Sequence, residues 1–275
     1  MMLRHLLLVA LLVVLPWVAT PTIATEAFDH GYSDYARLLA RYVDGARVAY
    51  AALTADRGAL DRVTAQFDAA AAREEAGWTR EQRMAFWINA YNAFTLRAIV
   101  DAYPIQSQWF TRQPRNSIRQ IGGVWTTPRW RAAGRSVSLD DIEHQVLRPG
   151  FKDARIHFAI NCASVSCPTL AAEPYRADTL DAQLDAAGRR YLASPEGLRQ
   201  DSNTLRVSSI FKWYGEDFVA EYSSIVPGTR PQVERAILGA IVKYGPPDAA
   251  VRARNGGPAI AFLDYNWSLN ETEPR

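Results

Sequence analysis

The segment that most constrains the fold is a long stretch, residues 79–103, that reads as one helix without a polar face. Thr79 and Gln82 have the spacing of a capping box, in which each side chain bonds to a free backbone N–H of the other residue. Pro104 ends the helix, because a proline disfavours helical geometry in the residue before it. Apolar residues occupy nearly every face between these limits, and such a helix must be surrounded by other elements. The sequence therefore predicts a central, buried helix.

Two asparagines interrupt this helix with polar groups. At about 100° per residue, Asn92 lies between Ile88, Leu96 and Ile99, on a face that has no reason to meet water. A buried amide without partners costs about 1–3 kcal/mol, so Asn89 and Asn92 must each bond to something. Either the backbone of a neighbouring loop supplies the partners, or both side chains belong to a polar active site. In the second case they bind a ligand or donate to an oxyanion.

The N-terminus has the parts of a secretory signal peptide: a basic start, a short apolar core at Leu6–Val18 and small residues at 20–24. The apolar run is shorter than the roughly 20 residues that a transmembrane helix needs. We therefore expect removal of residues 1–24, with cleavage near Ala24, which leaves no stable membrane span. The remaining residues 25–275 have no repeat and no linker that would divide them, so we expect a single periplasmic or secreted domain.

The rest of the chain alternates helical patterns with short strands. A net charge of +2 provides no basic field, so we expect no nucleic-acid partner. Hairpin-connected strands that are covered by many helices indicate an α+β fold, a helix-rich single domain around a small, mostly antiparallel sheet. The predicted elements are helices over 32–43, 57–73, 179–192 and 231–244, a hairpin of 122–130 with 135–138, and strands over 205–207 and 259–265.

A second capping box, Ser138–Asp141, predicts a helix that ends before Pro149. Glu143 falls inside the apolar stripe of this helix. A carboxylate on a core face needs a cation or hydrogen-bond donors. We expect Arg155 or His157, on the segment that follows, to supply one.

The run 155–168 holds both cysteines of the chain and one of its four histidines. Alternation in its first half predicts a strand, with one face toward the core and a more polar face, with His157 and Asn161, toward a cleft. A turn rich in Cys, Ser and Pro follows, and residues on such turns can be presented to a ligand. Whether Cys162 and Cys167 form a disulfide or expose a thiolate decides the class of function.

Five segments together resemble the domain of unknown function family 547, and they occur in the family's order. They read AFWINAYNAFTL at 85–96, LDDIEHQVLR at 139–148, RIHFAINCASVSCPTL at 155–170, SSIFKWYGEDF at 208–218 and YNWSLN at 265–270. The resemblance implies bacterial exported proteins and plant proteins without a settled activity. More loosely, it implies a fold similar to papain-like or transglutaminase-like cysteine hydrolases, possible here only in a permuted order. Asn266 departs from the family's usual Tyr-Asp-Trp-Ser-Leu-Asn, so any charged role of that Asp is lost or weakened.

That looser similarity suggests an enzyme, a cysteine-dependent amide hydrolase or acyltransferase acting on a peptide-like component of the cell envelope. Cys162 would be the nucleophile, His157 its base, and Glu143 or Asn161 the group that orients the base. Papain-like chains place the Cys before the His, whereas all four histidines here precede both cysteines. A straight strand would also hold the His157 and Cys162 side chains roughly 16 Å apart. The chain must therefore turn near Asn161, or His144 must act instead.

Two other hypotheses use the same cysteines. In the first, a Cys162–Cys167 disulfide, worth roughly 2 kcal/mol in the chain-entropy model, holds the recognition loop of a non-catalytic binding or scaffold domain. In the second, the pair performs thiol–disulfide exchange, although that chemistry usually has two residues between the cysteines rather than four. The spacing matches no common zinc pattern, and we predict neither a metal nor a cofactor. The sequence does not set the oligomeric state.

The aromatic segment 211–218 has two interpretations. In one, a helix packs Phe211, Trp213 or Tyr214 into the core while its charged side chains face water. In the other, Trp213 and Tyr214 form the wall of a binding cleft, together with Trp267.

Overall fold

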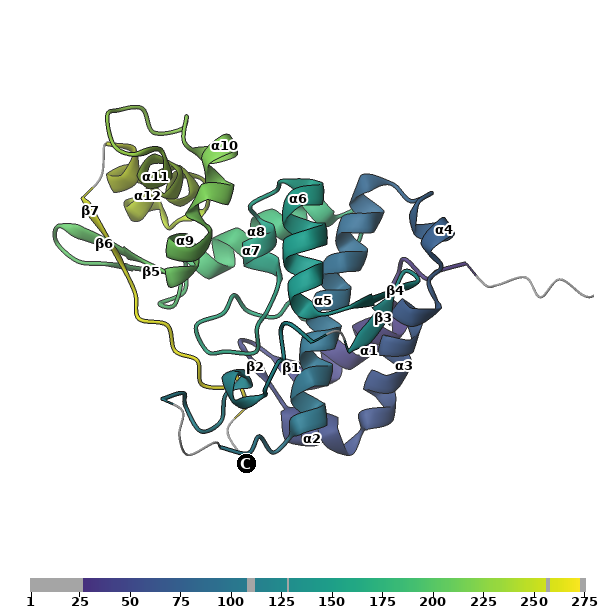
Figure 1. Ribbon diagram of the computed structural model, residues 1–275. Helices are drawn as coiled ribbons and strands as arrows, with labels where there is room; N and C mark the ends of the chain where they lie inside the picture. The colour runs from purple at the N-terminus through teal and green to yellow at the C-terminus, as the bar shows by residue number, and fades with distance from the viewer. Residues whose placement is uncertain (1–26, 108–111, 128, 256–257, 273–275) are drawn as a thin grey trace, which may run out of the picture.

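The computed structural model describes residues 27–107, 112–127, 129–255 and 258–272 (Figure 1). The predicted signal peptide and its cleavage site near Ala24 lie outside the described residues. Within these ranges, the structure contains no helix that combines the length and the apolar character needed to cross a membrane.

Helix α5 (Arg80–Ala102) is the predicted central helix (Figure 1). Its capping box is present: the Gln82 N–H donates to Thr79 Oγ1 at 3.2 Å, and the Thr79 N–H donates to Gln82 Oε1 at 2.9 Å. Every side chain from Met84 to Leu96 is buried. The prediction of a buried helix without a solvent face is therefore confirmed.

The N-terminal part of the chain packs around α5 as the first hydrophobic core. Helix α3 lies against α5, and the ring of its Phe67 meets Phe86 and Phe94 of α5 edge-on. The amphipathic helix α3 thus covers one side of the apolar helix α5 with its own apolar face. The elements before α5 are α1 (Ser33–Tyr42), β1 (Val43–Asp44), β2 (Arg47–Val48), α2 (Tyr50–Ala55), α3 (Arg57–Ala69) and α4 (Ala72–Glu75).

A short turn of helix, η1 (Ile118–Gln120), precedes the predicted hairpin. The hairpin consists of β3 (Trp130–Ala132) and β4 (Arg135–Val137), which pair in antiparallel fashion. Its first strand begins at Trp130 and not at Gly122, so the predicted strand was too long.

The second capping box opens a π-helical segment, η2 (Asp141–Leu147). The Asp141 N–H donates to Ser138 Oγ at 3.0 Å, and the Ser138 N–H donates to Asp141 Oδ2 at 2.9 Å. The predicted end before Pro149 is wrong, because the chain continues into α6 (Arg148–Phe151). Pro149 lies in the first turn of α6, where its missing N–H needs no partner.

The predicted strand over Arg155–Asn161 is also wrong, since a short helix, α7 (Ile156–Ala159), stands there. All side chains from Ile156 to Ile160 are buried. Because this segment is buried on all sides, none of its residues marks a solvent face. Alternation of residue types along the sequence therefore could not distinguish a strand from a helix.

The C-terminal part of the chain forms a second hydrophobic core beside the first. Its sheet has β6 in the centre, antiparallel to β5 and parallel to β7, and α11 packs against α10 and α12. The predicted helices over 179–192 and 231–244 are confirmed. The elements are α8 (Leu180–Leu192), β5 (Leu198–Gln200), β6 (Thr204–Val207), α9 (Ser209–Tyr214), η3 (Gly215–Phe218), α10 (Val219–Tyr222), α11 (Gln232–Tyr244), α12 (Pro247–Arg254) and β7 (Ala259–Phe262).

The two cores meet at α7, where Phe158 belongs to the second core and its neighbours Ile156 and Ala159 to the first. Residues 263–272, here called the C-terminal strap, join them again. The strap leaves β7 and runs back to the first core (yellow in Figure 1), where Leu269 is buried. The described residues form mostly helices with small sheets, which confirms the predicted α+β class.

Candidate active site

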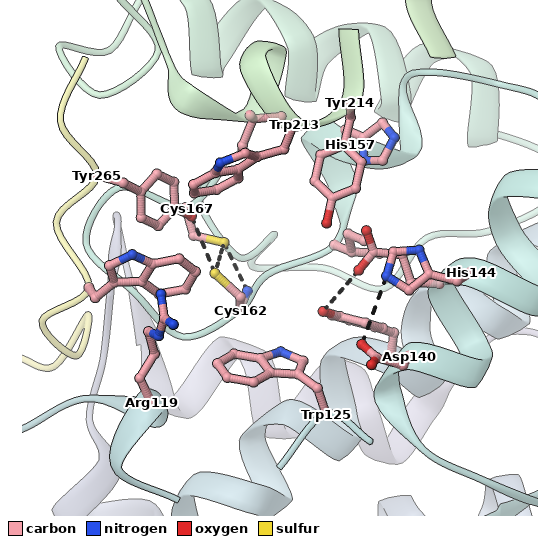
Figure 2. Close-up of a pocket in the computed structure, with 15 residues that line it drawn as sticks. Arg119, Trp125, Asp140, His144, His157, Cys162, Cys167, Trp213, Tyr214 and Tyr265 are labelled. Carbon is pink, nitrogen blue, oxygen red and sulfur yellow. Dashed lines mark hydrogen bonds and ion pairs between the residues drawn. The ribbon is translucent and has the colours of Figure 1, made fainter. Parts of the chain in front are cut away.

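A cavity of about 390 Å³ lies where the two cores and the C-terminal strap come together (Figure 2). Aromatic rings form much of its wall, and both cysteines of the chain line it. The lining residues are Tyr91, Arg119, Trp125, Asp140, Glu143, His144, His157, Ile160, Cys162, Cys167, Ile210, Trp213, Tyr214, Tyr265 and Trp267.

Cys162 and Cys167 touch but are not bonded. Their Sγ atoms are 2.7 Å apart, beyond the roughly 2.05 Å of a disulfide bond, and both cysteines are free. The backbone N–H of Cys162 donates to Cys167 Sγ at 2.9 Å. The structure thus corrects the expected Cys162–Cys167 disulfide: the pair is a contact between two thiols.

Asn161 organises the loop that carries the two cysteines. Its Nδ2 donates to the carbonyl of Pro168 at 2.7 Å, and its Oδ1 accepts the N–H of Ala163 at 2.8 Å. Ala163 has a φ of 59°, in the left-handed region that an L-residue rarely adopts. The buried Asn161 amide therefore holds both ends of the loop, and it does not contact an imidazole.

The C-terminal strap closes over the same loop. The Val165 N–H donates to the carbonyl of Ser268 at 2.8 Å, and the Asn270 N–H donates to the carbonyl of Ala163 at 3.1 Å. The side chain of Asn270 is buried and its Oδ1 accepts the Tyr50 hydroxyl at 2.9 Å. The strap thereby ties the cysteine loop to the first core.

The two thiols have opposite electrostatic environments. Burial raises the pKa of Cys162, but hydrogen bonds from Cys167, Ser164 and Tyr265 outweigh burial and lower that pKa from 9.0 to about 7. The Ser164 and Tyr265 hydroxyl oxygens lie 3.1 and 3.3 Å from Cys162 Sγ. Burial, followed by the hydrogen bond to Cys162, raises the pKa of Cys167 well above 9.0. Cys162 is half-buried and Cys167 is buried, so the thiol that ionises first is also the more accessible.

His157 is buried and is held by a carboxylate on another helical segment. Its Nε2 lies 2.7 Å from Asp217 Oδ2, and its ring stacks on Tyr214 with centroids 4.2 Å apart. Among the described residues, no imidazole lies within hydrogen-bond distance of Cys162 or Cys167. The structure places His157 in the wall of the same cavity as Cys162 but does not bring the two into contact.

Asp217 is the centre of a charged network behind Tyr214. Arg148 binds it with two hydrogen bonds, from Nε at 2.6 Å and from Nη2 at 3.0 Å. Burial raises the pKa of Asp217, but the bonds from His157 and Arg148 outweigh burial and hold that pKa well below its usual value. A third Arg148 nitrogen lies 3.0 Å from His144 Nδ1, which places His144 at the edge of the network.

Glu143 has partners other than the expected ones. The Tyr91 hydroxyl donates to its Oε2 at 3.5 Å. Burial is the largest cause of the raised pKa of Tyr214, and the nearby Glu143 carboxylate raises that pKa further. The expectation that Arg155 or His157 pairs with Glu143 is wrong. The Arg155 guanidinium is instead shared by three aspartates, Asp153, Asp181 and Asp185.

The two buried amides of α5 bond to backbone, as the simpler interpretation predicted. Asn89 donates to the carbonyl of Tyr175 and accepts its N–H, at 2.8 and 2.9 Å. Asn92 donates to the carbonyl of Ala159 at 3.0 Å and accepts the N–H of Asn161 at 2.8 Å. Asn92 thus ends α7 and fixes the chain immediately before Cys162, while neither amide lines the cavity.

The aromatic segment divides between core and cavity. Phe211 is fully buried, whereas 46% of Trp213 is exposed and Tyr214 is half-buried. Trp213, Tyr214 and Trp267 all line the cavity, so these rings belong to a wall of the pocket. Lys212 and Glu216 are exposed, as expected for the charged side chains of this segment, whereas the half-buried Asp217 is bound by Arg148 and His157.

Sequence reasoning did not find Asp217, Arg148, Ser164, Tyr265 or Arg119 as site residues. Signals for four of them existed, since Arg148, Asp217, Ser164 and Tyr265 lie inside the segments that carry the family resemblance. Within the described ranges, His, Cys, Asp and Glu side chains do not gather in a group of three or more that could hold a metal ion.

The fold and the site together define an α+β protein with an asymmetric cysteine pair in an aromatic pocket. Residues 76–192 match the family model described as "Protein of unknown function, DUF547", which confirms the family resemblance over those residues. The match begins directly after α4 and runs to the end of α8, and it includes both cysteines, His157 and Glu143. No curated protein and no solved structure matches the chain.

Proposed function

We propose that the pocket performs thiol–disulfide exchange, with Cys162 as the attacking cysteine and Cys167 as the resolving one. The observation that carries this proposal is the asymmetry of two sulfurs 2.7 Å apart. Cys162 is half-buried with a lowered pKa, and Cys167 is buried with a raised pKa. An attacking thiol works best when its pKa is near the ambient pH and its target can reach it. A resolving thiol needs only to reach the first sulfur.

In the reductive direction, the Cys162 thiolate attacks one sulfur of a substrate disulfide. The substrate S–S bond breaks as the new bond to Cys162 forms, and the departing sulfur takes a proton from water. Cys167 then loses its proton to water and attacks Cys162 Sγ, which expels the second substrate sulfur as a thiolate that is protonated in turn. The substrate disulfide gains two electrons and becomes two thiols, and the protein pair is oxidised to a disulfide. An external dithiol returns the pair to its reduced state by the reverse exchange.

Two further observations support this chemistry. The sulfurs need to approach by only roughly 0.7 Å to reach bonding distance, so the second step requires little movement of the loop. An exported location, which we propose from the N-terminal segment, would place the pair in an oxidising compartment where disulfide-bonded partners are available.

A single-turnover reaction with 2-hydroxyethyl disulfide tests the two roles. We expect Cys167→Ser to accumulate one mixed disulfide on Cys162, detected by its added mass, and the wild-type protein to end with an internal disulfide and two released thiols. Cys162→Ser should stay unmodified over the same time, with circular dichroism confirming that each variant is folded. A wild-type protein that retains the mixed disulfide, or one attacked first at Cys167, would contradict the assignment.

Cysteine-dependent amide hydrolysis or acyl transfer on a peptide-like envelope component is the second candidate. The observation in its favour is that Glu143, His144 and His157, three groups able to move a proton, line the cavity that holds Cys162. It lacks a contact between imidazole and thiol, which such a nucleophile needs. The Cys167→Ala variant separates the two functions, because a hydrolase keeps turning over an acyl substrate without Cys167 and an exchange enzyme stops at the mixed disulfide. A variant that binds but performs neither reaction would favour a non-catalytic binding domain.

A further inference from the structure

The pocket contains one cation that the protein itself does not neutralise. Arg119 lies on η1, and its guanidinium sits 4.8 Å above the ring of Trp267. Among the described residues, this guanidinium has no ion pair and no hydrogen-bond acceptor. Arg148, the other arginine beside the site, is by contrast bound on two nitrogens by Asp217. The exposed Arg119 therefore brings a charged guanidinium, whose N–H donors have no acceptor among the described residues, to the edge of the cavity.

The charges of the cavity are separated on either side of the sulfurs. Figure 2 shows Cys162 between Arg119 on one side and Asp140 with His144 on the other. Glu143 also lines the cavity, and it belongs to the same helical segment as His144. A ligand with a negative group is consequently repelled by one end of the pocket and attracted by the other, which gives it one preferred orientation.

Aromatic rings surround the Arg119 end. Trp267 stacks on Trp213 with centroids 5.8 Å apart, meets Trp125 edge-on at 6.2 Å and contacts Tyr265 at 4.5 Å. The Tyr265 hydroxyl in turn lies 3.3 Å from Cys162 Sγ. An apolar chain seated against these rings would therefore run from the guanidinium toward the attacking sulfur.

The geometry points to a low-molecular-mass disulfide with a carboxylate as the substrate class, its carboxylate bound by Arg119, its apolar chain against the tryptophans and its S–S bond against Cys162. This inference rests on the proposed exchange function. A cavity of about 390 Å³ is of the size that takes a small molecule, and it is far too small for a folded protein. The Arg fork matches the two oxygens of a carboxylate.

Two small disulfides of different charge test the inference on the reduced, full-length protein. The reaction rate with 3,3′-dithiodipropionate, which has a carboxylate at each end, is divided by the rate with neutral 2-hydroxyethyl disulfide. We expect Arg119→Gln to lower this ratio about tenfold, the typical loss of one charge-assisted interaction, and Arg119→Lys to lower it less. Arg115→Gln, an exposed arginine of the same loop outside the cavity lining, is the matched control and should leave the ratio unchanged. An unchanged ratio in Arg119→Gln would overturn the inference.

A binding measurement separates this inference from the exchange chemistry. Suberate has the length of 3,3′-dithiodipropionate but no sulfur, so it can bind and cannot react. We expect suberate to change the tryptophan fluorescence of Cys162→Ser, and this response to be lost in the double variant with Arg119→Gln. If the wild-type protein exchanges with neither disulfide but suberate binds through Arg119, the exchange function fails and the carboxylate site stands. If both disulfides react and suberate binds equally well with and without Arg119→Gln, the carboxylate site is wrong and the exchange function stands.

Discussion

The Nε2 atom of His157 lies 2.7 Å from Oδ2 of Asp217, so the imidazole nearest to the cysteines in the sequence is bound to a carboxylate and not to a thiol. Tyr214 covers one face of the ring, and Arg148 holds the carboxylate from the other side. These contacts connect α7, where the two cores meet, with η3 of the second core. The residue that looked like a general base is therefore part of the joint between the two cores.

We predict that Asp217→Asn destabilises the protein by about 1–3 kcal/mol at pH 7, because hydrogen bonds to a charged group are lost on the half-buried side chain. The pKa of Asp217 is lowered in the folded state, so its contribution is present above its unfolded pKa of about 3.9 and is lost as the pH falls further, through the folded pKa. Urea unfolding at pH 7, 5 and 3 should show a difference from wild type that narrows only at the lowest pH. Glu216→Gln, the exposed neighbour, is the control. A difference that is the same at every pH would contradict the ionic origin.

The alkylation of Cys162 by iodoacetamide should depend on pH with a midpoint at about 7, because only the thiolate reacts. Cys167→Ala removes one donor to this thiolate and should move the midpoint up by about one pH unit, as expected for one hydrogen bond to a charge. Cys167→Ser keeps a hydroxyl donor and should move it less. The rate of modification of Cys162, followed by mass spectrometry of the alkylated peptide, is the measurement. Equal midpoints in all three proteins would show that Cys167 does not stabilise the thiolate.

We predict that Asn266→Asp changes the free energy of unfolding by less than about 0.5 kcal/mol, the range for surface substitutions. The exposed Asn266 uses its Oδ1 to accept the Ser268 N–H at 3.0 Å, and an aspartate oxygen would do the same. Asn266→Ala removes this acceptor and should cost about 0.5–1.5 kcal/mol. Denaturant titration of the two variants gives both numbers. A large stabilisation by Asp would reveal a charged role that this contact does not explain.

The elements predicted correctly from the sequence are those whose ends carry their own local signals. Helix α5 is fixed by a capping box at Thr79 and by Pro104, and both act through neighbouring residues only. The prediction that the two buried asparagines have hydrogen-bond partners was also correct, because an unpaired amide costs free energy wherever it is buried. The prediction for the short helix α7 was wrong because its residues are buried on all sides, and the periodicity of the sequence does not indicate which elements they contact.

The candidate site was predicted only in part, because only some of its residues are close together in the sequence. Cys162, Cys167, His157 and Glu143 do line one cavity, which a short run of unusual residues was enough to indicate. Their partners come from far along the chain: Asp217 is 60 residues from His157, and Tyr265 is 103 residues from Cys162. Only the packing of the second core and the C-terminal strap brings these groups together, and neither leaves a local pattern in the sequence.

A comparison of Asn92→Leu with Asn89→Leu should separate stability from control of the site. Each substitution leaves one buried N–H and one buried carbonyl unpaired, so each should lower the free energy of unfolding by about 2–5 kcal/mol. Only Asn92 binds the backbone on either side of Ile160, directly before Cys162, whereas Asn89 binds Tyr175. We therefore expect Asn92→Leu alone to slow the alkylation of Cys162 at pH 7, measured without denaturant on the folded fraction. If both variants slow it equally, the amide of Asn92 acts through global stability and not by positioning the cysteine.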